Sequence, residues 1–133
     1  MSQWLDVCSV DDLVAHSGVC ALVEETQVAL FYMPEDNAIF AGTIPDTSRS
    51  AVTRKSDPGQ IFAINNFDPF SLINILSRGL IGDIQGEPMV SSPIYKQHFS
   101  LKTGICFEDE TVKVDSYGVR IEGNRVEVNL GAA

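Results

Sequence analysis

The chain has 133 residues and a mass of 14.5 kDa, the size of a single domain with one core. Apolar residues make up 44% and charged residues 20%, so the composition excludes a mainly disordered chain. The formal net charge of −9 opposes binding to nucleic-acid phosphates and to anionic membrane surfaces, and we expect neither as a partner.

The N-terminal sequence, MSQWLDVCSVDDLV, has no basic region followed by an apolar one. No later segment approaches 18 consecutive apolar residues. We therefore expect a cytoplasmic location.

A strand is predicted over residues 3–8, and a short helix of at most two turns over 9–16. Ser9 is its expected N-cap, with Asp11 and Asp12 in the first turn, where carboxylates favour the helix dipole.

Two apolar runs then flank a polar EET sequence, the pattern of a β-hairpin that pairs residues 19–23 with 28–33. Residues 34–60 lose any steady apolar period and contain Pro45, Pro58 and two glycines, which predicts a long exposed loop. Because so long a loop is unusual in a compact domain, the segment is either mobile or carries a short strand around AIFAG.

Strand character returns at residues 60–66, and two further strands are predicted over 86–93 and 96–104. In the last of these, Phe99 and Leu101 alternate with polar residues and should share one face, while His98 points the other way.

The C-terminal segment 117–130 gives the clearest local signal in the chain. Val119 and Ile121 alternate inward, a Gly123-Asn124 turn follows, and Val126 and Val128 alternate back, which is typical of a tight hairpin. The chain as a whole therefore predicts an all-β fold: a sandwich or small barrel of short antiparallel strands with one short helix, in one domain over 1–133.

Two loops interrupt the predicted strands. The first lies in IFAINNFDPFSLINILSRG (61–79), where Pro69 follows Asp68, and the second in VSSPIYKQHFSLKTG (90–104), where Pro93 follows Ser92. From Trp4 to Leu130 the chain resembles a Rieske-type domain. The resemblance rests on the order of a strand, a DPF loop, the GEPMVSSPIYKQHFSLKTGIC segment and a C-terminal hairpin.

The resemblance implies four positions for cluster ligands, where the family carries Cys-x-His and Cys-x-x-His. Alignment on the prolines places them at Asp68 and Phe70 in the first loop and at Ser92 and Tyr95 in the second. None is a thiolate or an imidazole, which the Rieske-type cluster requires. We therefore expect no cofactor in this chain and two loops that hold each other, with Phe70 and Tyr95 packing in the vacated volume.

With these substitutions, the DPF and GEPMVSSP segments are similar to the small subunits of cytoplasmic NAD(P)H-dependent nitrite reductases. That resemblance implies a large subunit that carries FAD, sirohaem and an iron–sulfur cluster and reduces nitrite to ammonium. This chain would be its non-catalytic partner, with no catalytic residues of its own. The 34–60 segment is longer than the family's usual connection.

A surface for that partner follows from the two loops, because aromatic residues and arginine are enriched at interface hot spots. The alternative is a self-packed pair of loops in which Arg78 neutralises Asp68. The candidate partner-binding residues are Asp68, Pro69, Phe70, Arg78, Tyr95 and Lys96.

Two alternative functions remain open for such a domain. The chain could be a stand-alone electron carrier with an unconventional centre on its cysteines, or an adaptor for another oxidoreductase. Cys8, Cys20 and Cys106 are odd in number and form no CxxC pair, so they predict neither a disulfide framework nor a zinc site. We interpret each as a small buried apolar residue.

Two smaller constellations have simpler readings. Cys106 and His98 could form a nucleophilic pair, but the sequence shows no group to orient them. The acidic run EDE at 108–110 could bind calcium, but no loop of twelve ligand-bearing residues surrounds it, and a solvated turn is expected.

Overall fold

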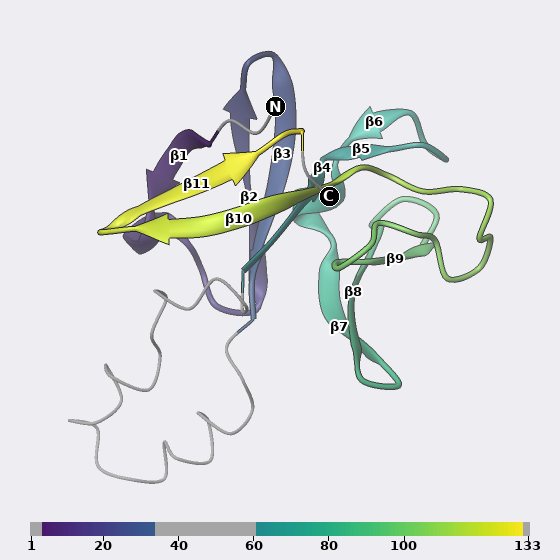
Figure 1. Cartoon of the computed structure of the whole chain (residues 1–133). Helices are drawn as coiled ribbons and strands as arrows, with labels where there is room; N and C mark the ends of the chain where they lie inside the picture. The colour runs from purple at the N-terminus through teal and green to yellow at the C-terminus, as the bar shows by residue number, and fades with distance from the viewer. Residues whose placement is uncertain (1–3, 34–60, 132–133) are drawn as a thin grey trace, which may run out of the picture.

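A computed structural model describes residues 4–33 and 61–131 of the chain, which form antiparallel sheets (Figure 1). The expected loop over 34–60 lies outside these residues, and the single-domain boundaries stay a prediction. The predicted all-β fold of short antiparallel strands is confirmed.

The larger sheet has the strand order β1-β11-β10-β4-β3-β2 and lies on one side of the molecule in Figure 1. The expected hairpins both belong to it. Its strands are β1 (Leu5–Ser9), β2 (Ser17–Val23), β3 (Thr26–Tyr32), β4 (Ile61–Asn65), β10 (Ser116–Glu122) and β11 (Arg125–Asn129).

The other side holds two small sheets, which the sequence predicted only in part. One is the two-stranded β5-β6 and the other is the three-stranded β7-β8-β9. Their strands are β5 (Phe67–Asp68), β6 (Ile73–Asn74), β7 (Leu80–Ile84), β8 (Glu87–Ser91) and β9 (His98–Ser100).

The C-terminal hairpin has the predicted register. Val119 pairs with Val128 and Ile121 with Val126, and Gly123 in the turn has a φ of +63°. This left-handed conformation is one that glycine adopts without the steric cost that a Cβ imposes. Alternation along the two strands therefore locates this hairpin correctly.

The predicted helix over 9–16 is wrong, because only a 3-10 turn, Val10–Asp12, forms there. The cap is as expected: the Ser9 hydroxyl accepts a hydrogen bond from the Asp11 amide, and the Ser9 amide donates to the Asp12 carboxylate. Leu13 then returns to extended geometry, with its side chain buried in the core. Burial of Leu13 stops the helix from continuing, and the described residues contain no α-helix.

Strand β3 is buried on both faces and joins the two sides of the molecule. Val28 and Leu30 point into a core shared with β1, β10 and β11, whereas Ala29 and Phe31 point into a second core shared with β8 and β9. This explains why β3 reads as a continuous apolar run rather than an alternating one. The position of the loops therefore depends on the large sheet.

Candidate functional site

The two loops are joined directly by the side chains of Asp68 and Ser92. Asp68 ends β5, and Ser92 follows β8. The Ser92 hydroxyl donates a hydrogen bond of 2.5 Å to Asp68 Oδ2, and both residues have 0% exposure. Because both side chains are fully buried, water does not compete for this hydrogen bond. It connects two of the four positions at which the resemblance places cluster ligands.

The first loop is a tight turn organised by Asp68. Its Oδ1 accepts from the Phe70 amide at 2.8 Å, and its carbonyl oxygen accepts from the Leu72 amide at 2.7 Å. Leu72 closes this turn with a φ of +63°. Asp68 thus shapes its own loop and holds the second one.

The second loop repeats this arrangement around Ser92. Its Oγ accepts from the Ile94 amide at 3.3 Å, and its carbonyl accepts from the Lys96 amide at 3.1 Å. Lys96 closes the turn with a φ of +69°. The two loops are therefore similar in backbone geometry, each with a left-handed residue four positions after the joining side chain.

A third turn of the same kind shows which residue suits this geometry. The Ser100 carbonyl accepts from the Gly104 amide at 2.8 Å, and Gly104 has a φ of +80°. A Cβ at Gly104 would lie 2.0 Å from the Val114 carbonyl oxygen. Glycine relieves the left-handed strain at this closing position, whereas the two joined loops carry Leu72 and Lys96 there.

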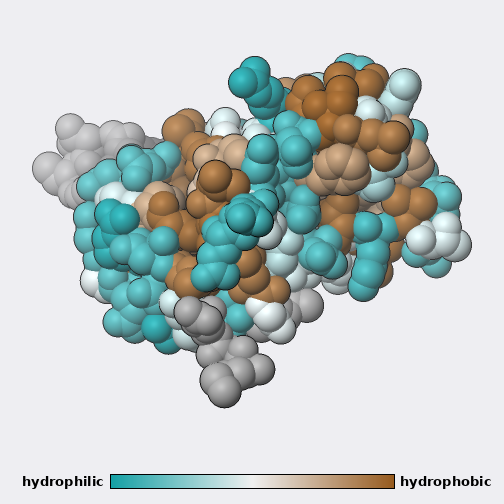
Figure 2. Space-filling model, turned by 90° about the horizontal axis from the view of Figure 1, so that it is seen from above, coloured by the Kyte–Doolittle hydropathy of each residue, from teal (hydrophilic) through white to brown (hydrophobic). Residues whose placement is uncertain are grey.

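The expected packing of Phe70 with Tyr95 is wrong. The Phe70 ring instead lies against Phe99, with ring centroids 6.1 Å apart, and Tyr95 is 59% exposed. Tyr95 therefore faces outward rather than filling the space between the loops. Seen from above, Figure 2 shows apolar side chains on both halves of the molecule, including a group on the side where β5 to β9 lie.

Arg78 does not neutralise Asp68, contrary to the second interpretation of the loops. Arg78 is exposed at the end of a 3-10 turn, Leu76–Arg78, and the ion pairs among residues 4–33 and 61–131 do not include it. The Asp68 carboxylate is satisfied by neutral donors, namely the Ser92 hydroxyl and the Phe70 amide. Asp68 is consequently an internal residue, while Arg78 stays available at the surface.

Asn66 fastens the first loop to the large sheet, a role that the sequence analysis missed. Its amide donates to the Gln27 carbonyl, and its side-chain oxygen accepts from the Ser77 amide at 2.6 Å. Its own carbonyl accepts from the Ile75 and Leu76 amides. Asn66 is 2% exposed, so these bonds are shielded from water. The signal available was a pair of asparagines, Asn65 and Asn66, between the apolar run of β4 and Phe67.

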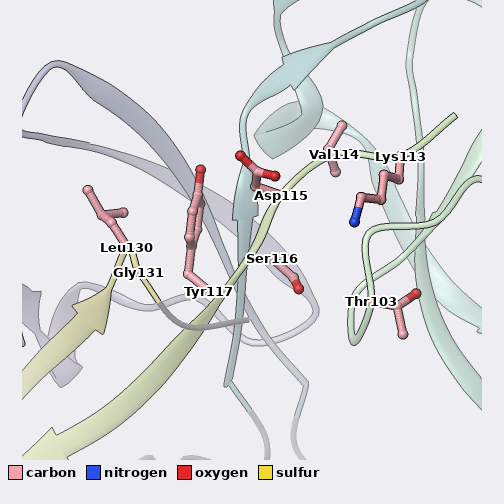
Figure 3. A pocket seen from close by; sticks show the side chains of 8 residues that line it. All are labelled: Thr103, Lys113, Val114, Asp115, Ser116, Tyr117, Leu130 and Gly131. Atoms are coloured by element: carbon pink, nitrogen blue, oxygen red, sulfur yellow. The ribbon is translucent and has the colours of Figure 1, made fainter. Parts of the chain in front are cut away.

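Two open pockets share the segment 113–115 as part of their walls. Figure 3 shows one of about 270 Å³, which Asp115 and Tyr117 help to line, and the other has a volume of about 280 Å³. Phe67 and Pro69 of the first loop line the second pocket, together with Lys113. The first pocket is lined by Ser116, Asp115 and Lys113, but among the described residues no hydrogen bond joins a hydroxyl of either pocket to a base. The pockets therefore show no activated nucleophile.

Cys106 and His98 are brought together through Glu108, one of the residues expected in a solvated turn. Glu108 Oε2 lies 2.5 Å from His98 Nδ1, and its Oε1 accepts from the Cys106 thiol at 3.5 Å. Burial, the largest cause, raises the pKa of the Cys106 thiol, which keeps the sulfur protonated. The carboxylate separates the thiol from the imidazole, so the arrangement is a structural contact and not an activated nucleophile.

The cysteines are all free, but only one has the expected burial. Cys106 is buried, Cys8 is half-buried and Cys20 is exposed. Within the described ranges no three His, Cys, Asp or Glu side chains gather to hold a metal ion. No helix in those ranges is long and apolar enough to span a membrane.

Comparison with known proteins gives the family. Residues 3–53 and 43–129 match the Rieske-like [2Fe-2S] domain. The chain is 40% identical to the nitrite reductase (NADH) small subunit of Escherichia coli K12 over 128 residues, which cover 96% of this chain and 98% of that protein. The chain belongs to the Rieske-like family and, within it, to the nitrite reductase small subunits.

Solved structures agree with this assignment. The NMR structure of the Escherichia coli protein NirD has a TM-score of 0.74 to this chain at 40% identity, covering 97% of each. A Sphingomonas yanoikuyae B1 ferredoxin has a TM-score of 0.63 at 18% identity, covering 96% of this chain and 98% of its own, and shares the fold alone.

A third relative has a different organisation. The nitrite reductase [NAD(P)H] large subunit of Klebsiella oxytoca is 31% identical over 125 residues, which cover 94% of this chain but 11% of that protein. A domain similar to this chain is therefore part of one long polypeptide in that relative.

Proposed function

We propose that this chain is the small subunit of an NAD(P)H-dependent nitrite reductase and supports the reduction of nitrite to ammonium by a large subunit. The observation that carries the proposal is the 40% identity to the Escherichia coli small subunit over almost the full length of both chains. The Klebsiella oxytoca large subunit, which contains a similar domain, supports the reductase as the partner.

The redox groups of this reaction would be FAD, sirohaem and an iron–sulfur cluster, all in the large subunit. The Rieske-type cluster does not fit the residues assigned to its ligand positions in this chain. Asp68 and Ser92 bond to each other, and the Phe70 ring packs on Phe99. Neither a thiolate nor an imidazole is offered there, although a Rieske centre needs both kinds of ligand. The small subunit therefore acts by binding and not by carrying electrons itself.

The proposed location is the cytoplasm, where NAD(P)H is available to the complex. Three free cysteines, with Cys20 exposed, are typical of a protein in a reducing compartment.

The partner surface comprises the exposed members of the candidate set, with Asp68 beneath them as the residue that joins the loops. Pro69 and Phe70 are partly exposed on the first loop, Arg78 follows it, and Tyr95 and Lys96 are exposed on the second. The surface therefore combines apolar and cationic side chains, a composition suited to an interface core and its rim.

Reconstitution tests the proposal. The large subunit is expressed with and without this chain, and co-purification, NAD(P)H oxidation and ammonium formation are measured at matched cofactor content. We expect a stable complex and higher nitrite-dependent turnover when the small chain is present. A large subunit that neither binds the chain nor changes its assembly or turnover in its presence would contradict the proposal.

A further inference from the structure

Four of the nine exposed large apolar side chains in the described part of the chain lie on the two joined loops. Leu72 is 70% and Ile73 47% exposed on the first loop, and Ile94 is 41% and Tyr95 59% exposed on the second. Large apolar residues singly exposed are ordinary, but a group of them on adjacent loops is typical of an interaction site.

The hydrogen bonds of the loops hold these side chains at one place. The Leu72 amide is bonded to the Asp68 carbonyl, and the Ile94 amide to the Ser92 hydroxyl. Asp68 and Ser92 are in turn bonded to each other. The backbones of Leu72 and Ile94 are therefore each hydrogen-bonded directly to one residue of the buried Asp68–Ser92 pair. The pair thereby fixes how the exposed apolar side chains of the two loops are placed relative to each other.

Backbone strain is a secondary observation, since left-handed non-glycine residues occur in both loops but also at His16, Glu24, Glu25 and Gln85. Leu72 has a left-handed φ of +63° and a mostly exposed side chain, so it contributes little to the chain's own core. Lys96 closes the second loop in the same conformation, whereas the third turn has Gly104. Non-glycine residues in this region cost free energy and concentrate at functional sites. The strain is accounted for if Leu72 serves a contact with another molecule.

The charge of the two loops indicates what kind of partner they fit. The net charge of the chain is −9, yet residues 69–82 and 90–97 contain Arg78 and Lys96 and no acidic residue. Both cations are exposed, and neither forms one of the ion pairs in the described part of the chain. An apolar group with a cationic edge fits a partner that offers an apolar site with an acidic edge.

We propose that the large subunit of the reductase docks on a two-loop surface made of Leu72, Ile73, Ile94 and Tyr95, with Arg78 and Lys96 at its edge. Asp68 and Ser92 are its positioning residues: they set the spacing of the loops and do not touch the partner. This inference rests on the proposed function. It adds Leu72, Ile73 and Ile94 to the sequence-based set, puts them in place of the half-buried Pro69 and Phe70, and moves Asp68 from the surface to the interior.

A binding titration of purified large subunit with the full chain tests the surface, using matched leucines. Leu72→Asp is compared with Leu22→Asp, since Leu22 is 73% exposed on β2 of the large sheet. Aspartate tolerates left-handed backbone better than leucine, so Leu72→Asp leaves the fold intact. We expect Leu72→Asp to raise Kd about tenfold or more, the effect of losing an interface hot spot, and Leu22→Asp to leave Kd unchanged.

The cationic edge has its own matched pair. Lys96→Glu should weaken binding and reduce its salt dependence, whereas Lys102→Glu, on the third turn, should do neither. Ser92→Ala should weaken binding and speed hydrogen exchange at the Leu72 and Ile94 amides without changing the circular dichroism spectrum, a combination that a purely structural role would not give.

The outcomes separate the two proposals. If the wild-type chain does not bind the large subunit, the proposed function fails. If it binds and Leu72→Asp binds as tightly as Leu22→Asp, the proposed function stands and the two-loop surface is wrong. Tyr95→Ser, at a second exposed position, repeats the comparison independently of the backbone at Leu72.

Discussion

The large sheet and the two-loop side satisfy their charges in opposite ways. On the sheet, Arg120 pairs with Glu127 at 2.7 Å and Arg125 with Asp6 at 3.0 Å. On the loops, Arg78 and Lys96 are exposed and take part in none of the ion pairs found among residues 4–33 and 61–131. The sheet pairs its arginines internally, whereas the two loop cations have no ionic partner among the described residues, as the proposed docking surface requires.

Backbone regularity differs in the same direction. The sheet is built of strands with up to seven residues, and β2 pairs with β3 in continuous register, while β5 and β6 have two residues each. The loops depend instead on the side chains of Asn66, Asp68 and Ser92, which supply hydrogen bonds that the short strands lack. The large sheet therefore provides stability, and the loops provide a surface shaped by side-chain hydrogen bonds.

The greatest loss of stability is expected from a substitution in β3 that weakens the connection between the two sides of the molecule. Phe31→Ala removes a fully buried ring from the core that supports the loops, and should lower the free energy of unfolding by about 3–5 kcal/mol. Leu22→Ala, on the neighbouring strand but exposed, should change it by less than about 0.5 kcal/mol. Denaturant titration measures both, and similar losses would show that the second core does not support the fold.

A smaller loss is expected where the first loop is fastened to the sheet. Asn66→Ala leaves the buried Ser77 amide without its acceptor and should cost about 1–3 kcal/mol. Asn74→Ala, at an exposed position of the same loop, is the control. Hydrogen exchange should rise at Ser77 in the first variant only, and an unchanged rate there would contradict the assigned role of Asn66.

Leu72→Gly should change stability and binding in opposite directions. Glycine relieves the left-handed strain, so the variant should be more stable by about 0.5–1 kcal/mol while binding the large subunit less tightly. Leu22→Gly, in the interior of β2, should instead be destabilised by about 0.5–1 kcal/mol. Thermal unfolding and a binding titration together check the pair. A Leu72→Gly variant that is less stable than the wild type would argue against strain at this position.

The smallest expected effect is a pH dependence at Glu108. Burial acts to raise the pKa of this carboxyl, but the hydrogen bonds from the His98 amide and ring outweigh it and hold the pKa below its usual value. Because the folded state binds this proton more weakly, the stabilisation is present above the unfolded pKa and is lost as the pH falls through the lower, folded pKa. Denaturant midpoints should therefore fall on acidification, and fall less in Glu108→Gln.

Glu110→Gln is the control for this titration, since Glu110 is an exposed acidic neighbour on the same turn. An equal change in the pH dependence of both variants would mean that the contact with His98 is not its source.

The hairpins of the large sheet were the part of the structure that the sequence predicted best, whereas β5, β6 and β7 were not predicted. Alternating apolar residues and a Gly-Asn turn were sufficient for the C-terminal hairpin, because both signals are local. The prolines located the two loops for the same reason. The helix over 9–16 failed because the core position of Leu13, which ends the 3-10 turn, depends on distant strands.

The details of the site depend on long-range contacts, which a single sequence does not reveal. Asp68 and Ser92 are separated by 24 residues, and Asn66 and Gln27 by 39. The sequence analysis expected Phe70 and Tyr95 to pack between the loops, and only the fold shows that Phe70 packs on Phe99 instead. The positions of the loops were therefore predictable, but which side chains face inward was not.

Iron analysis of the purified chain tests the central claim most directly, that a hydrogen bond between Asp68 and Ser92 stands where Rieske proteins carry their cluster. The chain is incubated anaerobically with iron and sulfide, desalted, and examined by visible absorption and metal content. We expect a colourless protein without stoichiometric iron. A firmly bound iron–sulfur centre that disappears when Asp68 and Ser92 are replaced by alanine would contradict it.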